Sequence, residues 1–557
     1  MAAAPSALLP GNYPKAIERE EEERWLVWLT TADHKRIGVL YLWTALLFFL
    51  AGGVESLLMR GQLAYPNNTF LTPQEYDGAF TLHGVTMIFF VIIPTVFGLG
   101  NYLLPLMIGA RDVAYPRLNA FSYWLVPAGG LLLYISYTAG GPPSAGWYAY
   151  APLTENFYSP GQGIDYYSFA LIMSGIGTIG TSINLIVTVL YNRAPGMTYR
   201  RLPVFVWMVI VTSVLALAAL PSLTGDLIQI ELDRFLSLHF FDAAAGGSPI
   251  LWQHFFWIFG HPEVYIMILP VFGVISEVIP VFSRKPIFGY TYLVASGIAI
   301  GFLSFGVWAH HMFTTGMSPI EDMVFSATSM AIAIPTGVKI WTWLATLYRG
   351  RLRFAAPMKF ALGFIAMFTI GGLSGVTLAV VPIDWQVNAS YYLVAHFHYV
   401  LFGGSAFGLF AALYYWFPKM SGRMLSERLG TWHFWIMMLG FNLTFFPMHL
   451  LGFLGMPRRV YTYPAGLGWG PYNFAETVGA FILGVSMLIF LTNLFVSLRH
   501  GRRAGANPWD AWSLEWATSS PPPPYNFAQI PVVGSRRPLR SLQESAQERR
   551  AEAEAEA

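Results

Sequence analysis

Long stretches of the chain are almost continuously apolar, and short polar stretches separate them. A membrane-spanning helix needs about 20 predominantly apolar residues. Twelve stretches are long enough, at residues 37–59, 78–107, 117–140, 166–191, 203–229, 250–281, 287–312, 322–348, 358–380, 390–416, 431–455 and 473–498. Because a bilayer core offers no water to backbone N–H and C=O groups, such stretches form helices. We therefore predict an all-α membrane protein with twelve transmembrane helices.

The distribution of charge predicts how these helices are oriented. Hydrophobic residues make up 55% of the 557 residues and charged residues only 11%, whereas a soluble domain has about 25% charged residues. Fourteen Lys and Arg residues lie in loops after even-numbered spans, and four follow odd-numbered spans: Arg60, Arg234, Arg458 and Arg459. Loops rich in Lys and Arg stay cytoplasmic, so both termini are predicted to be cytoplasmic. The net charge of +2 does not indicate a nucleic-acid partner.

Polar segments flank the predicted twelve-helix core of residues 37–498. Residues 1–36 are predicted to be a cytoplasmic N-terminal segment, and residues 499–557 a cytoplasmic C-terminal tail. This tail contains SSPPPPYNF and ends in RRAEAEAEA. A composition of this kind predicts a peripheral or disordered extension over residues 504–557.

Six of the twelve histidines lie deep enough in the predicted spans to suggest chemistry rather than solvation: His83, His261, His310, His311, His396 and His398. Ionisable side chains inside membrane helices commonly mark functional sites. The chain has no cysteine, so histidine must supply the ligands of any soft or borderline metal. At about 1.5 Å of rise per residue, all six converge on the outer half of the bilayer.

The spacing of His396 and His398 indicates two metals. Successive residues of an α-helix turn by about 100°, so these two side chains point about 200° apart and cannot share one ion. Each can instead bind a haem on its own side of the helix, and His83 can supply the second axial ligand of one haem. The remaining trio of His261, His310 and His311 suits copper, which imidazole binds well.

Five motifs surround these residues: TLHGVTMIFF at 81–90, WQHFFWIFGHPEVYI at 252–266, WAHHMF at 308–313, PTGVKIWTW at 335–343 and YYLVAHFHYV at 391–400. Over residues 30–500 the chain resembles subunit I of the haem–copper terminal oxidases, in the subfamily of mitochondrial-type cytochrome c oxidase. The resemblance implies two A-type haems, with His83 and His398 on the low-spin iron and His396 on the high-spin iron. It also implies one copper ion on His261, His310 and His311, with Tyr265 covalently linked to His261 as a donor of an electron and a proton.

Candidate proton-carrying residues lie towards the cytoplasm from this centre. Lys339 is the only Lys deep in a predicted span, and its depth favours a proton path in which Thr336 and Ser276 take part. The resemblance implies a second path. It would begin at Asp112, pass Asn101, Asn119 and Asn184, and end at Glu263.

On the outer side, the resemblance implies that Arg458 and Arg459 bind haem propionates, that Arg60 contacts the periphery of the low-spin haem and that Trp257 packs at the active site. The family usually has a His-Asp pair before helix 10 that serves Mg²⁺ and a propionate. Here Asn388 and Ala389 occupy those positions, with Asp384 nearby. Because Ala cannot ligate a metal, we expect the Mg²⁺ site to be weakened, rearranged or absent.

The implied function is the catalytic subunit of a bacterial terminal oxidase in the cell membrane, which reduces O₂ to water and pumps protons. The implied partners are an oxidase subunit II, bearing copper if cytochrome c is the electron donor, and subunit III-like helices. Quinol is the alternative donor. Two remoter alternatives make different predictions: nitric oxide reductase should lack Tyr265 and the proton-path residues, and a secondary transporter should show inverted repeats and bind no haem.

Overall fold

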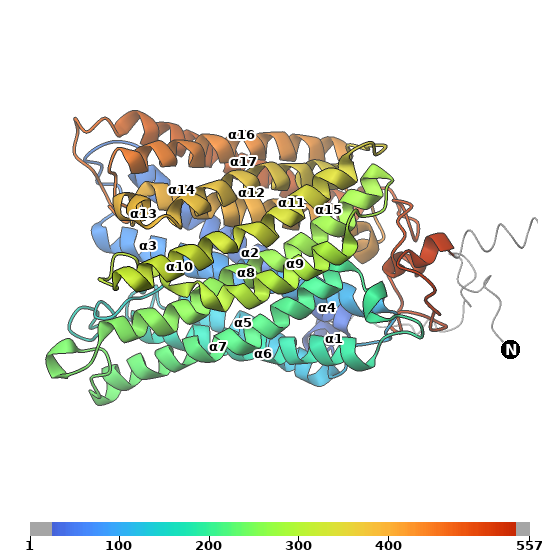
Figure 1. Ribbon diagram of the computed structural model, residues 1–557, viewed down its shortest axis with the longest axis horizontal. Helices are drawn as coiled ribbons and strands as arrows, with labels where there is room; N and C mark the ends of the chain where they lie inside the picture. Colours follow the sequence, from blue (N-terminus) through green and yellow to red (C-terminus); the bar gives the residue numbers. More distant parts are fainter. Residues whose placement is uncertain (1–24, 542–557) are drawn as a thin grey trace, which may run out of the picture.

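The computed structural model describes residues 25–541, and this part of the chain is helical, without a β-strand. Figure 1 shows the long helices lying side by side along the longest axis of the molecule. The α-helices are α1 (Trp25–Leu29), α2 (His34–Gln62), α3 (Pro73–Val85), α4 (Ile93–Ile108), α5 (Pro116–Ile135), α6 (Gly163–Tyr191), α7 (Val204–Leu236), α8 (Pro249–Ser283), α9 (Tyr290–Leu303), α10 (Pro319–Ala331), α11 (Ala333–Leu347), α12 (Ala356–Leu378), α13 (Val381–Val387), α14 (Tyr391–Val400), α15 (Phe407–Ser421), α16 (Glu427–Phe453) and α17 (Gly470–His500).

Within residues 25–541, eleven helical segments are long and apolar enough to cross a membrane. They correspond to eleven of the twelve predicted spans. The remaining prediction, 287–312, corresponds to the shorter apolar helix Tyr290–Gly306, formed by α9 and the 3₁₀ turn η5 (Ser304–Gly306). A second 3₁₀ turn, η6 (Trp308–Met312), follows. His310 and His311 therefore lie on a tight turn beyond the α-helix and not on its last turn, because the backbone tightens from α to 3₁₀ geometry before it reaches them.

The most deeply buried helices are α4 and α8. Every residue of α4 is buried, as expected for a helix that is apolar on all sides. A small residue lets α2 approach α4 closely: a Cβ added to Gly98 would lie 2.7 Å from the Cβ of Tyr41. Outer helices such as α11 and α17 expose many apolar side chains, including Trp341 and Phe481, which suits contact with lipid.

Two of the spanning helices contain a π-helical segment. Segment η2 (Thr86–Ile92) joins α3 to α4, and segment η7 (Leu401–Ala406) joins α14 to α15. Each begins three residues after a candidate haem ligand, His83 in the first case and His398 in the second. Such wide turns are frequent at functional sites because they change the direction of side chains without breaking the helix.

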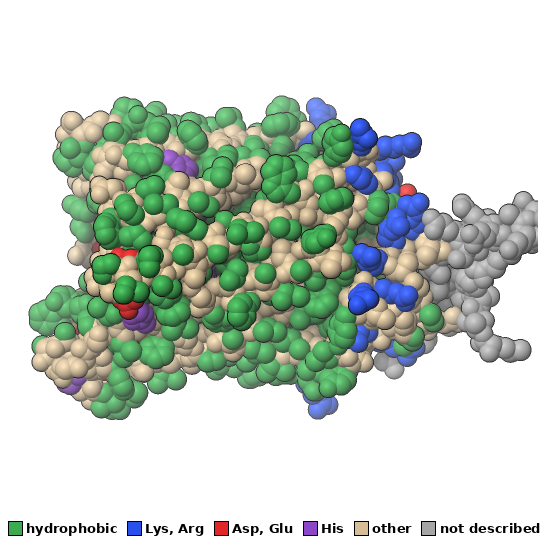
Figure 2. All heavy atoms as spheres, viewed as in Figure 1, with side chains coloured by type: hydrophobic (Ala, Val, Ile, Leu, Met, Phe, Trp, Pro, Cys, Tyr) green, Lys and Arg blue, Asp and Glu red, His purple; other side chains and the backbone are tan. Residues whose placement is uncertain are grey.

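One end of the bundle carries most of the visible Lys and Arg side chains (Figure 2). The C-terminal segment, defined here as residues 504–541, packs against this end (Figure 1), where it contacts α2, α4 and α15. Of the two predicted alternatives, the structure contradicts the disordered one for this segment, because Trp516, Asn526 and Phe527 are buried where it packs on the periphery of the bundle. Its apolar and aromatic side chains give the segment enough surface to pack. Residues 542–557 of the predicted extension, and residues 1–24 of the predicted N-terminal segment, lie outside the described residues.

Candidate metal centre

A cavity of about 1360 Å³ lies within the bundle and contacts all six histidines that the sequence singles out. Its lining is mostly apolar and also includes Tyr265, Trp257, Arg458 and Arg459. Large, mainly apolar cavities with a few convergent polar groups are typical of cofactor sites. The structure thus brings together, from α3, α8, α14 and η6, side chains that lie up to about 315 positions apart in the sequence.

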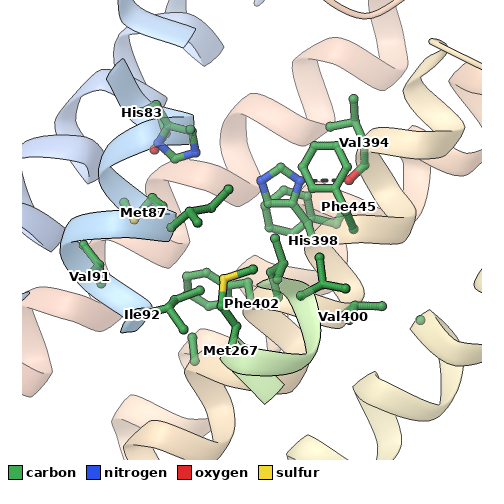
Figure 3. A pocket seen from close by; sticks show the side chains of 18 of the residues that line it. His83, Met87, Val91, Ile92, Met267, Val394, His398, Val400, Phe402 and Phe445 are labelled. Atoms are coloured by element: carbon green, nitrogen blue, oxygen red, sulfur yellow. Dashed lines mark hydrogen bonds between the residues drawn. The ribbon is translucent and has the colours of Figure 1, made fainter. Parts of the chain in front are cut away.

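His83 and His398 face each other across this cavity (Figure 3). Their ring centroids are 6.5 Å apart, and the ring planes differ by 23°. Each ring is held through Nδ1. His83 Nδ1 donates to the Gly52 carbonyl oxygen, and His398 Nδ1 donates to the Val394 carbonyl oxygen, both at 2.8 Å. A backbone hydrogen bond at one ring nitrogen fixes the tautomer and leaves the other nitrogen free for a metal. The pair therefore fits the two axial ligands of one haem iron.

His396 is held separately from this pair, on the side of α14 that faces α12. Its Nδ1 lies 3.0 Å from the carbonyl oxygen of Gly371 and 2.9 Å from the hydroxyl of Ser374. A Cβ added to Gly375 would lie only 2.9 Å from Cε1 of the ring. The ring is thus closely packed against α12 and keeps Nε2 for a ligand. This arrangement agrees with the expectation that His396 and His398 serve different metals.

The third set of imidazoles forms a compact cluster. One ligand nitrogen each from His261, His310 and His311 can be chosen so that all three lie within 4.8 Å of one another. His261 Nε2 is buried and has no hydrogen-bond partner. His310 Nδ1 lies 2.8 Å from the Ser329 hydroxyl, and the indole of Trp257 stacks on His311 with ring centroids 3.8 Å apart. Three clustered imidazoles, one of which has a buried nitrogen without a hydrogen-bond partner, fit a copper ion.

Tyr265 lies beside the same cluster. It follows His261 by one turn of α8, and the two ring centroids are 4.8 Å apart. Tyr265 also lines the cavity. The sequence spacing predicted only that the two side chains could touch, and the structure brings them into contact.

The arginines that the sequence analysis predicts for the outer side line the cavity, and they also have protein partners. Arg458 donates to the Tyr148 hydroxyl, and the Arg459 guanidinium lies 4.2 Å from the centroid of the Tyr148 ring. Arg60 lines the cavity and forms a buried ion pair with Glu476, whose carboxylate lies 3.1 Å from the guanidinium. Guanidinium groups recognise carboxylates such as haem propionates, so this set fits the edge of a haem.

The positions at which the family's Mg²⁺ ligands are expected hold a different pair here. Asn388 donates from Nδ2 to Asp384 Oδ2 at 2.9 Å. Ala389 lines the cavity but has no side-chain atom that could ligate a metal, and its carbonyl oxygen accepts from the Arg458 backbone N–H at 2.9 Å. Burial raises the pKa of Asp384 to about 6, although the hydrogen bond from Asn388 acts in the opposite direction.

Lys339 is fully buried on α11, and its ammonium donates to the Leu293 carbonyl oxygen at 3.0 Å. Thr336, one turn earlier, lines the cavity together with Tyr265. Ser276 accepts a hydrogen bond from the Trp343 indole at 3.0 Å. The three predicted residues therefore lie on two neighbouring helices, α8 and α11, on one side of the cavity.

The second predicted set spreads over α4, α5, α6 and α8. Asp112 lies in the loop between α4 and α5, and burial raises its pKa to about 6. Asn101, Asn119 and Glu263 are buried, and each has at least one side-chain atom without a protein hydrogen-bond partner. Asn184 differs, because its amide is used by the backbone of Tyr115. Unpaired buried polar atoms are the usual sites of internal water, so this set suits a hydrated path.

Several other buried side chains share this property, and two of them lie on the helices that carry Asn119 and Asn184 and were not predicted. The hydroxyls of Ser122 on α5 and Ser182 on α6 are buried and have no hydrogen-bond partner. Ser122 follows Asn119 by three positions, which places both on one face of α5. That spacing is a signal the sequence offered, but serine is so common in membrane helices that spacing alone could not single it out.

Comparison with known proteins identifies the family. A family model described as "Cytochrome C and Quinol oxidase polypeptide I" matches residues 36–516. The chain is 50% identical over 525 residues to quinol oxidase subunit 1 of Bacillus spizizenii, covering 93% of this chain and 81% of that protein. It is 51% identical over 532 residues to a probable cytochrome c oxidase subunit 1-beta of Nocardia farcinica, covering 95% and 90%. A cryo-EM structure of a heme-copper terminal oxidase dimer superposes with a TM-score of 0.72 over 85% of each chain, at 17% identity, which supports the fold.

Proposed function

The chain belongs to the family of cytochrome c and quinol oxidase polypeptide I, subunit I of the haem–copper oxidases, and from this we propose that it is the catalytic subunit of a terminal oxidase. The proposed reaction is the four-electron reduction of O₂ to water, coupled to proton pumping. The observation that carries this proposal is the convergence of six buried imidazoles on one cavity, three of them clustered within reach of one ion.

In this proposal each histidine has one role. His83 and His398 hold the low-spin haem iron, His396 the high-spin iron, and His261, His310 and His311 the copper. When bound, the high-spin haem and the copper would take up O₂ and supply electrons to it. The chain holds the imidazoles of His83, His396 and His398 in one tautomer through backbone carbonyls, lines the cavity with apolar side chains that exclude water, and keeps Tyr265 beside His261. A-type haems are part of the proposal, and Mg²⁺ is not, because Asn388 and Asp384 bond to each other.

Protons are proposed to come from the cytoplasmic side along the two sets of residues. Lys339, with Thr336 and Ser276, leads towards Tyr265. Asp112 leads through Asn101, Asn119 and Asn184 to Glu263, and Ser122 and Ser182 would hold further water along this path. A carboxyl or ammonium group buried beside water can pass protons because its charged and neutral forms lie close in free energy.

We further propose twelve crossings of the bacterial cell membrane, with α9 as the twelfth and both termini in the cytoplasm. The gathering of Lys and Arg at one end of the bundle supports this orientation, since such residues favour the cytoplasmic side. The core of the proposed arrangement is residues 37–498.

Cytochrome c is the proposed electron donor, through a copper-bearing subunit II, with subunit III-like helices as further partners. Quinol is the second candidate, and a specific observation favours keeping it: relatives named quinol oxidase and relatives named cytochrome c oxidase are equally similar to this chain, at about 50% identity. The donor is bound outside the site described here, so the two candidates share the same metal centre.

The test is oxygen uptake by the purified complex, supplied with reduced cytochrome c in one run and with a quinol in another. Uptake with cytochrome c alone supports the favoured donor, and uptake with quinol alone replaces it while leaving the metal centre in place. No uptake with either donor, in a preparation that retains its haems, would overturn the oxidase proposal and favour reduction of nitric oxide.

A further inference from the structure

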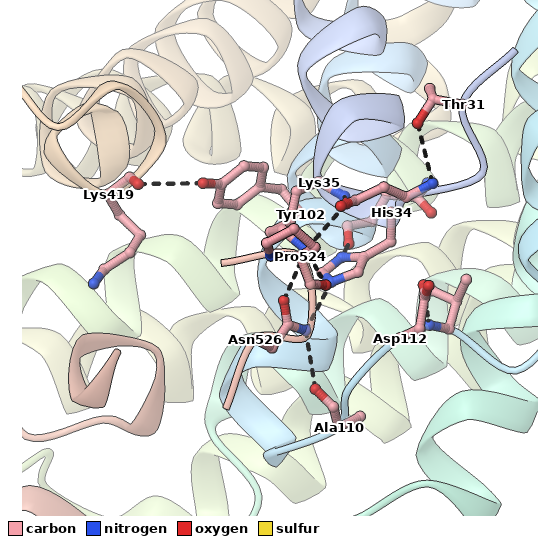
Figure 4. A network of polar contacts seen from close by, with 12 residues as sticks. Thr31, His34, Lys35, Tyr102, Ala110, Asp112, Lys419, Pro524 and Asn526 are labelled. Atoms are coloured by element: carbon pink, nitrogen blue, oxygen red, sulfur yellow. Dashed lines mark hydrogen bonds and ion pairs between the residues drawn. The ribbon is translucent and has the colours of Figure 1, made fainter. Parts of the chain in front are cut away.

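The C-terminal segment, residues 504–541, reaches the proposed proton entrance through one side chain, that of Asn526 (Figure 4). Asn526 belongs to the SSPPPPYNF motif, is fully buried and adopts a left-handed backbone conformation with φ of 60°. The Thr518 hydroxyl donates to its carbonyl oxygen at 2.7 Å. The turn is therefore fixed from within the segment, and it presents the amide of Asn526 to the helical bundle.

Every polar atom of this amide is used. Asn526 Nδ2 lies 2.8 Å from His34 Nε2 and donates to the Ala110 carbonyl oxygen at 2.9 Å. Asn526 Oδ1 accepts from the Lys35 ammonium at 2.9 Å. His34 in turn contacts the Asn101 carbonyl oxygen through Nδ1 at 2.7 Å. A buried amide that satisfies all of its hydrogen bonds specifies one arrangement of its neighbours.

Lys35 is held at this point by the C-terminal segment. Besides Asn526 Oδ1, its ammonium donates to the Pro524 carbonyl oxygen at 3.0 Å and pairs with Asp33 Oδ1 at 3.0 Å. Two of the three acceptors thus come from the segment. Within residues 25–541, the only carboxylate that pairs with Lys35 is that of Asp33.

Asp112 lies within electrostatic range of the Lys35 ammonium. Burial raises the pKa of Asp112 to about 6, and the charge of Lys35 acts in the opposite direction. The loop that carries Asp112 is tied on one side by Asn526 at Ala110 and on the other by the Thr188 hydroxyl at the Ala114 N–H, at 2.9 Å. A direct ion pair with a cation typically lowers the pKa of a carboxyl by about 1–3 units, which would weaken Asp112 as a proton acceptor.

We propose that Asn526 is a positioning residue for proton uptake: its amide holds the Lys35 ammonium and the Ala110 carbonyl group in place, and so keeps Lys35 from pairing with Asp112. This inference rests on the proposed role of Asp112 in proton uptake. It assigns a function to the C-terminal segment, which supplies two of the three acceptors that hold the Lys35 ammonium beside the proposed proton entrance.

The test compares variants of the full complex by oxygen uptake, with haem spectra and copper content measured on each preparation. Asn526→Leu is similar in size but its side chain cannot hydrogen-bond. It should lower oxygen uptake about tenfold, the factor that corresponds to a fall of one unit in the pKa of Asp112, with haem and copper content unchanged. Adding Lys35→Met to Asn526→Leu should restore most of the uptake, because no cation is left to pair with Asp112. Lys35→Met alone should keep uptake within about twofold of the parent.

Asn507→Leu is the matched control, since it is the same substitution in the same segment and the Asn507 side chain bonds only to the backbone of Ala511 within the segment. It should leave uptake unchanged. If Asn526→Leu fails to assemble with haem, Asn526→Ser is the second variant, because its side chain stays polar but is too short to reach Lys35 and Ala110. Full uptake in an assembled Asn526 variant would overturn the inference. Low uptake that Lys35→Met does not restore would also overturn it, because the segment would then act by some other route.

Asp112→Asn, measured in parallel, separates this inference from the proposed function. Low uptake in Asp112→Asn together with full uptake in Asn526→Leu overturns the inference and leaves the proton path standing. Full uptake in Asp112→Asn overturns the path itself.

Discussion

The packing of His396 against α12 makes a single methyl group a sensitive probe of the metal centre. In Gly375→Ala the new Cβ would lie 2.9 Å from Cε1 of His396. Carbon atoms pack at about 3.5–4.0 Å, so the ring must move by about 0.6 Å or more. That movement stretches the hydrogen bonds from Nδ1 to the Gly371 carbonyl oxygen and the Ser374 hydroxyl, which hold the ring at 3.0 and 2.9 Å.

Two magnitudes follow from this displacement. Overpacking a close-packed site lowers the free energy of unfolding by about 1–3 kcal/mol, which a bundle of this size should survive. A shift approaching 1 Å at a catalytic group can lower the rate by about 100-fold. Gly375→Ala should therefore assemble but lose most of its oxygen uptake.

The assay combines oxygen uptake with the carbon monoxide difference spectrum of the reduced complex, which reports the high-spin haem. The low-spin haem should keep its absorbance, because His83 and His398 do not contact Gly375. Gly225→Ala is the matched control: it is also a helical glycine, but its added Cβ meets nothing within 4 Å. Full uptake and an unchanged carbon monoxide spectrum in Gly375→Ala would refute the assignment of His396 to the reacting haem.

Three further outcomes are expected. His310→Ala should lower the copper content severalfold while both haems remain, and an unchanged copper-to-iron ratio in elemental analysis would contradict the copper assignment. Arg60→Met should lower the free energy of unfolding by about 3–5 kcal/mol, because it leaves the buried Glu476 carboxylate unpaired. Adding Glu476→Gln should recover much of that loss, as measured by thermal unfolding. Asp384→Asn should raise Tm at pH 8, because a carboxyl whose pKa is raised to about 6 destabilises the fold once ionised. That gain should disappear as the pH falls from 6 towards 4, and an equal gain at both pH values would show that ionisation is not the cause.

Most of the helical fold could be predicted from hydropathy alone. Eleven of the twelve predicted spans correspond to helices of spanning length, because an apolar stretch of that length has no other way to satisfy its backbone in a bilayer. The exception is instructive. Residues 287–312 are mostly apolar, but the α-helix gives way to 3₁₀ turns at Ser304, and hydropathy does not distinguish one helical geometry from the other.

The ligand-bearing residues could also be identified from the sequence, because histidine is rare inside membrane helices and the HFH spacing places two rings on opposite faces of one helix. Their assembly into one centre could not. His261 lies beside His310 and His311 only because α8 packs against η6, and the π segments after His83 and His398 have no signature in composition. The ion pair of Arg60 with Glu476 likewise joins residues more than 400 positions apart.

The sequence by itself determined which segments enter the membrane and which side chains can bind metals, since both depend on the chemistry of single residues and their local spacing. Only the tertiary structure decided which of those side chains meet, and where the C-terminal segment lies. The SSPPPPYNF motif is polar and rich in proline, so it carries no sign of a buried site. Its Asn526 becomes a fixed contact only when the ends of α2 and α4 supply a donor, an acceptor and a ring nitrogen at hydrogen-bond distance.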